Sequence, residues 1–127
     1  MKQENRIRNF RKSLSHAARG FFYAFKNERN FQIELLAAVA VLFLIWYFKI
    51  KNWEAIILVL MIMWVLVAEL INTVMERVVD MLKPRIHPYA RLIKDIMAAV
   101  VLISSVVALV VGIIIFLPYL RDFSNRF

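Results

Sequence analysis

Five polar residues recur at helical spacing within an otherwise apolar stretch of the chain. Drawn as a helix with 3.6 residues per turn, they share one arc of about 100°: Glu69, Asn72, Thr73, Glu76 and Asp80. Three of them are carboxylates, which repel one another unless a cation lies between them. Mg²⁺ suits such oxygen ligands, because it accepts one or two carboxylates and takes its other ligands from water and phosphate. The spacing therefore predicts a polar site that could hold a metal ion.

Glu69 lies deepest within the apolar stretch. An acidic residue near the centre of a membrane helix costs about 2.5–3.5 kcal/mol on insertion scales, so a carboxylate at this depth indicates a function. Glu69 and Glu76 are separated by about 10 Å along the helix axis, which favours different roles for the two. Glu76 and Asp80 could also be solvated residues beside Arg77.

Basic residues follow in the next connection and in the helix after it. Pro88 fits the first position of that helix. Three cationic side chains share an arc of about 60° on it: His87, Arg91 and Lys94. They could hold a polyphosphate at the mouth of the hairpin that carries Glu76. They could equally anchor a cytoplasmic helix end, as Lys and Arg commonly do, and Lys94 could pair locally with Asp95.

Two more carboxylates lie near the start of the first apolar segment. Glu28 is placed where a surface helix should give way to a membrane span, and Glu34 lies further in, before an unbroken apolar run. Either residue could cap a helix or lie at the membrane interface. Glu34 could also act in the site, because an acidic residue directly before a long apolar run is unusual.

The composition identifies the elements that must position these residues. Of the 127 residues, 62% are hydrophobic and 20% are charged, whereas soluble domains contain about 45–50% apolar residues. A chain of this length cannot hide so much apolar surface from water. The absence of Cys excludes disulfides and thiolate sites, and two Gly and three Pro argue against a loop-rich β fold. The sequence predicts a small all-α membrane protein.

We expect a single membrane domain over residues 1–127 with three transmembrane helices at 31–50, 55–77 and 96–120. Residues 5–27 are expected to form an amphipathic surface helix. Its apolar stripe consists of Ile7, Phe10, Leu14, Phe21 and Phe25. Thirteen of the 17 Lys and Arg residues precede the first span or lie between the second and third, which predicts a cytoplasmic N-terminus and an outer C-terminus.

Several functions are not expected. The basic residues are dispersed along apolar elements rather than gathered on a separate domain, which argues against nucleic acid binding. The sequence contains no glycine-rich phosphate loop, no zinc-ligand spacing and no nucleophile elbow. A phosphotransferase of this sequence would therefore not use a soluble kinase scaffold.

The pattern E-x-x-N-T-x-x-E-x-x-x-D over residues 69–80, followed by His87 and Lys94-Asp95, resembles the prokaryotic diacylglycerol kinase and undecaprenol kinase family. The resemblance extends upstream to Ala24-Phe25-Lys26, Glu28-Arg29-Asn30 and Glu34. It implies a homotrimeric enzyme of the bacterial inner membrane with three spans and a surface helix. Such an enzyme would transfer the γ-phosphoryl group of Mg-ATP to a membrane lipid hydroxyl.

The resemblance also implies roles for individual residues. Glu69 would be the general base, and Glu28 and Glu76 would hold Mg²⁺. The nucleotide would be bound by Asn72, Arg85, Ile86, His87, Lys94 and Asp95. The lipid would be bound by Asn30, Glu34, Glu69 and Ala98.

The acceptor lipid and the functional class each have alternatives. Glu28-Arg29-Asn30 and His87-Pro88 resemble the undecaprenol branch more closely, so undecaprenol is the expected acceptor and diacylglycerol the alternative. A small transporter is a second class, but its key charges should lie near the bilayer midplane rather than toward one side. A non-catalytic homologue is a third, although every carboxylate, the Asn and the Lys of the family pattern are present.

Overall fold

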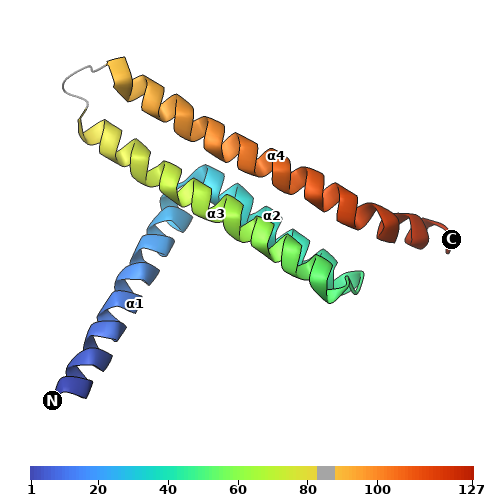
Figure 1. Ribbon diagram of the computed structural model, residues 1–127, viewed down its shortest axis with the longest axis horizontal. Helices are drawn as coiled ribbons and strands as arrows, with labels where there is room; N and C mark the ends of the chain where they lie inside the picture. Colours follow the sequence, from blue (N-terminus) through green and yellow to red (C-terminus); the bar gives the residue numbers. More distant parts are fainter. Residues whose placement is uncertain (83–87) are drawn as a thin grey trace.

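The computed structural model describes residues 1–82 and 88–127. The described residues form helices and no strands (Figure 1). In chain order the helices are α1 (Lys2–Asn27), α2 (Arg29–Tyr47), α3 (Asn52–Met81) and α4 (Pro88–Ser124). Among them, α2, α3 and α4 are long and apolar enough to cross a membrane. The predicted all-α membrane protein with three spanning helices is therefore confirmed.

α2 ends at Tyr47, earlier than the expected residue 50. Lys49 adopts a left-handed backbone conformation with φ of 51°, which a helix cannot continue through. The backbone amides of Lys49 and Ile50 donate to the carbonyls of Trp46 and Ile45, which is the hydrogen-bond pattern of a Schellman cap. Ile50 is buried beyond this cap, so the turn also fixes an apolar contact.

The other helices extend past their expected bounds. α1 begins at Lys2 rather than residue 5, α3 covers Asn52–Met81 rather than 55–77, and α4 begins at Pro88 rather than 96. At 1.5 Å per residue, α3 and α4 are about 45 and 55 Å long. Both exceed the hydrocarbon core of about 30 Å, so their polar ends continue into the interface.

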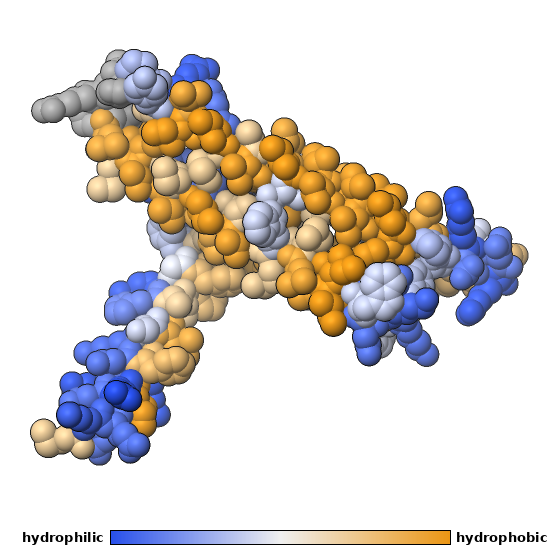
Figure 2. Space-filling view, viewed as in Figure 1, coloured by the Kyte–Doolittle hydropathy of each residue, from blue (hydrophilic) through white to orange (hydrophobic). Residues whose placement is uncertain are grey.

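α3 is the central helix, because it packs against both α2 and α4. α1 packs mainly against α2, and its Tyr23 side chain also interacts with Arg77 of α3. A small core holds the three spans together near the α2–α3 turn, and its buried members are Ile50, Leu58 and Ile115. Most other apolar side chains face outward, which gives the spans their continuous hydrophobic surface (Figure 2). Such a surface fits contact with lipid chains.

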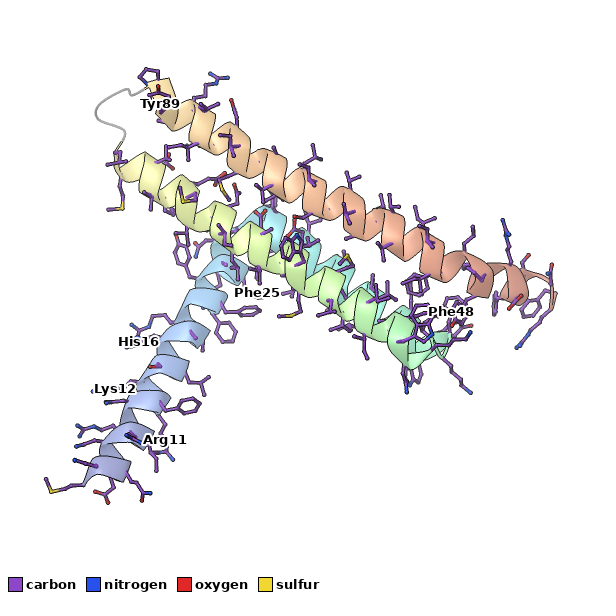
Figure 3. All side chains as sticks on the ribbon, in the orientation of Figure 1. Arg11, Lys12, His16, Phe25, Phe48 and Tyr89 are labelled. Carbon is purple, nitrogen blue, oxygen red and sulfur yellow. The ribbon has the colours of Figure 1, made fainter. Side chains whose placement is uncertain are left out.

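α1 leaves the bundle at a steep angle to the spans (Figure 1). Its charged residues form a hydrophilic region at the far end of the helix (Figure 2). Phe25 lies on one side of α1, and Lys12 and His16 lie on another (Figure 3). An apolar stripe opposite polar residues on a helix at this angle fits a position along the membrane surface.

Candidate functional site

The polar face of α3 points into the bundle and changes in exposure along its length. Glu69 is 2% exposed, and Asn72 and Thr73 are each 7% exposed. One turn further on, Glu76 is half-buried, and Asp80 is exposed at the end of the helix. The residues that the sequence places on one arc therefore form a path from the interior of the bundle to its surface. We call this end of the bundle the polar end.

Three more carboxylates lie near enough to Glu69 for electrostatic repulsion between them and Glu69: Glu28, Glu34 and Glu76. We call these four residues the acidic cluster. Glu34 comes from α2, Glu69 and Glu76 come from α3, and Glu28 is the single residue that joins α1 to α2. The fold thus brings together carboxylates that are separated by up to 48 positions in the sequence.

Several oxygen atoms in this region are buried without a hydrogen bond. They are Oε2 of Glu34, Oε2 of Glu69 and Oγ1 of Thr73, none of which has a partner among the described residues. A buried polar atom without a partner costs roughly 1–3 kcal/mol, and native proteins contain few of them. Their occurrence within one region leaves three oxygen atoms that can hydrogen-bond to water or to a ligand.

Glu28 is held by a residue that sequence reasoning did not connect with it. Nη2 of Arg77 donates to Oε1 of Glu28 over 2.5 Å, which links the α1–α2 junction to α3. The helical projection places Arg77 away from Glu69, and nothing in the spacing indicates a partner 49 positions away. Arg77 also gives the acidic cluster a nearby positive charge at its edge.

The donor set suits a particular kind of metal site. Among the described residues, no three Asp, Glu, His or Cys side chains are grouped so that they could hold a metal ion by themselves. Mg²⁺ rarely uses such a cage and is usually bound through one or two carboxylates together with phosphate oxygens. Glu28 and Glu76 could supply those two carboxylates, since both act on Glu69 electrostatically. The residues present therefore fit Mg²⁺ that arrives with a nucleotide.

The predicted nucleotide-binding residues are only partly described by the structure. Nζ of Lys94 donates to Oδ1 of Asp80 over 2.6 Å, so α3 and α4 are joined at the polar end. Asp95 is exposed next to Lys94. Arg85, Ile86 and His87 lie outside the described residues.

The predicted lipid-binding residues do not all lie together. Glu34 lines a groove of about 570 Å³ bordered by α2, α3 and α4, which we call the α2–α4 groove. Apart from Glu34 and Ser105, its lining side chains are apolar. Ala98 is exposed on α4 and Asn30 is exposed near the start of α2, and neither lines the groove. Sequence reasoning missed this groove, because it depends on how three helices are arranged.

Three helices that can cross a membrane, buried carboxylate oxygens without a partner among the described residues and an apolar groove together define an integral membrane protein with a polar site beside apolar surface. The model of the prokaryotic diacylglycerol kinase family matches residues 15–116. The chain belongs to this family, and it is a membrane lipid kinase.

Two curated relatives are similar to most of the chain. An undecaprenol kinase from Bacillus subtilis (strain 168) is 37% identical over 116 residues, which cover 91% of this chain and 94% of the relative. A diacylglycerol kinase from Synechocystis sp. is 34% identical over 107 residues, which cover 84% of this chain and 61% of the relative. The family resemblance predicted from the E-x-x-N-T-x-x-E pattern is therefore confirmed.

Proposed function

We propose that this protein transfers the γ-phosphoryl group of Mg-ATP to the hydroxyl of undecaprenol. The observation that carries the proposal is Glu69, a carboxylate that is 2% exposed and has an oxygen with no partner among the described residues. Glu34, which interacts electrostatically with Glu69, opens onto the apolar groove. A lipid hydroxyl at this position would supply the missing hydrogen bond.

In this proposal Glu69 takes the proton of the acceptor hydroxyl. The oxygen then bonds to the γ-phosphorus, the bond between that phosphorus and the β–γ bridging oxygen breaks, and ADP leaves. Glu28 and Glu76 would hold Mg²⁺, which supplies charge neutralisation at the phosphates. Phosphoryl transfer depends mainly on positioning and electrostatic stabilisation, so a few placed carboxylates and cations suffice.

Undecaprenol is proposed as the acceptor because the similarity to the Bacillus undecaprenol kinase covers nearly all of both chains. Diacylglycerol is the second candidate, since the Synechocystis relative carries that name and is 34% identical. Purified protein in detergent micelles should be given labelled Mg-ATP with each lipid separately. Faster transfer to undecaprenol supports the proposal, faster transfer to diacylglycerol changes the acceptor, and transfer to neither rejects the kinase reaction as stated.

The role of Glu69 has a separate test. General acid–base catalysis typically contributes about 10²–10⁴-fold to a rate. We expect Glu69→Gln to lower kcat by that factor while Mg-ATP binding, measured by calorimetry, changes little. The amide has nearly the same size, so folding should be preserved. Equal loss of nucleotide binding would show that Glu69 acts as a ligand rather than as a base.

We further propose that the polar end faces the cytoplasm of a bacterial inner membrane and that the enzyme is a homotrimer. The orientation rests on the excess of Lys and Arg near α1 and the α3–α4 connection. The absence of native Cys makes a single engineered Cys at Ser13 a clean accessibility reporter.

Native mass spectrometry would give the subunit number. Recovery of activity on mixing Glu69→Gln subunits, altered on α3, with Asp95→Asn subunits, altered on α4, would show that sites are shared.

A further inference from the structure

The α2–α4 groove begins at the acidic cluster and leads away from it. Its lining extends from Glu34 on α2 to Phe48, the residue after α2, and from Ser105 to Leu120 on α4. At 1.5 Å per residue these ranges correspond to about 21 and 23 Å. Since the hydrocarbon core of a bilayer is about 30 Å thick, the groove follows most of the depth of one membrane.

The two ends of the groove differ in chemistry. At one end is Glu34, whose Oε2 is buried and has no hydrogen-bond partner among the described residues. Beyond Glu34 the walls are alkyl and aromatic side chains, with Ser105 as the other polar residue. A ligand that matches both ends has one hydroxyl attached to a long hydrocarbon chain.

Small residues give the groove its space. Ala37 and Ala38 line it from α2, and Ala108 and Gly112 line it from α4. A Cβ atom added at Gly112 would meet no heavy atom within 4 Å, so the groove is open beside this residue. A side chain at this position would therefore start in open space beside the groove.

We propose that Gly112 and Ala108 set how long a hydrocarbon chain the enzyme accepts, with the chain of the acceptor in the α2–α4 groove and its hydroxyl between Glu34 and the neighbouring Glu69. The inference rests on the proposed lipid kinase reaction. A lipid chain is favoured over a second copy of this protein because the groove is continuous with the acidic cluster, where the acceptor hydroxyl must arrive. The occupant then also satisfies the Glu34 carboxyl.

Gly112 divides the groove into two parts. It lies seven residues beyond Ser105, or about 10 Å further along α4. A short prenol such as geraniol can place its hydroxyl at Glu34 and end before Gly112, whereas undecaprenol must pass it. Filling the groove at Gly112 should therefore affect the two acceptors differently.

The test compares Gly112→Leu with the wild type, using geraniol and undecaprenol as acceptors. One added methylene in an apolar pocket is worth about 10–200-fold, so we expect kcat/KM for undecaprenol to fall by at least about tenfold. The value for geraniol should stay within about twofold of the wild type. Gly112→Ala adds little volume and serves as the mild variant at the same position.

Val110→Phe is the matched control on α4. Val110 is 49% exposed and does not line the groove, so a larger side chain there leaves the groove unchanged. We expect both acceptors to react at the wild-type rate. Ala108→Leu narrows the groove one turn before Gly112 and should also slow undecaprenol, which keeps the test decisive if Gly112→Leu fails to assemble.

The outcomes separate this inference from the proposed function. If the wild type phosphorylates neither prenol, the proposed reaction fails and takes the inference with it. If the wild type is active and the groove variants have the same kcat/KM for undecaprenol as the wild type, only the inference about the groove is overturned. If the variants lose both acceptors and their mass by light scattering changes, the groove is an interface between copies, which also overturns it.

Discussion

Replacing Phe31 with alanine should detach α1 from the spanning helices. The Phe31 side chain is 0% exposed, and its ring meets that of Phe21 edge-to-face with the centroids 5.5 Å apart. Truncating a buried Phe to Ala costs about 3–5 kcal/mol. About 0.5–1.5 kcal/mol of this loss should belong to the aromatic pair itself. Because Phe21 belongs to α1 and Phe31 to α2, the part of the loss that belongs to this pair weakens the docking of α1 rather than the packing of the spans.

The assay is a double-mutant cycle with Phe21→Ala, Phe31→Ala and the combined variant, with unfolding followed by circular dichroism in mixed micelles. Hydrogen exchange over residues 2–27 reports α1 separately. Glu28 lies three residues before Phe31, so the same variants should raise KM for Mg-ATP. Phe43→Ala is the control, because Phe43 is on the same helix and is 56% exposed.

The reasoning would be refuted if Phe31→Ala destabilised the protein no more than Phe43→Ala did. A coupling energy near zero between Phe21 and Phe31 would also contradict it, because the contact would then contribute nothing to docking. An unchanged KM for Mg-ATP, together with faster exchange over α1, would show that Glu28 is positioned by other contacts.

Three further substitutions test single contacts. Glu76→Gln should weaken Mg-dependent ATP binding, measured by titrating Mg²⁺ at fixed ATP, and an unchanged Mg²⁺ requirement would exclude Glu76 as a ligand. Ser104→Ala removes the 3.0 Å hydrogen bond from Nε1 of Trp64. It should cost about 0.6 kcal/mol and at most about 1.7 kcal/mol, as such bonds do between membrane helices, so a larger loss of unfolding free energy would point to a different role. Tyr119→Phe removes a hydroxyl that donates to Oε2 of Glu54 over 2.6 Å. We expect a lower unfolding midpoint, since hydrogen bonds to a charged acceptor are stronger than neutral ones, and an unchanged midpoint would contradict it.

The elements of this protein could be predicted from its sequence because lipid imposes a simple pattern. Apolar runs identify three spans, and the basic and apolar residues before Arg29 indicate a surface helix. The bounds were less accurate at the ends. Lys49 is an ordinary residue in a left-handed conformation, and no glycine marks the place where α2 ends.

The candidate site could be predicted only where one helix carries it. Glu69, Asn72 and Thr73 share a face because they are close in sequence, so helical spacing is enough to group them. Glu28 and Arg77 come from different elements, and their ion pair depends on how α1, α2 and α3 meet. The α2–α4 groove depends on three helices together, and Gly112 gains its importance only from that arrangement.

The junction between α1 and α2 has a mechanical consequence. Only Glu28 separates the two helices, with φ of −107° and ψ of 107°, so any change in the direction of α1 must be absorbed at this residue. α1 is about 39 Å long, and the residue about which it would tilt, Glu28, belongs to the acidic cluster. When α1 tilts about this residue, its N-terminal end moves far and the residues next to Glu28 move little. Undulation of the surrounding lipid can therefore tilt α1 and leave the acidic cluster almost in place.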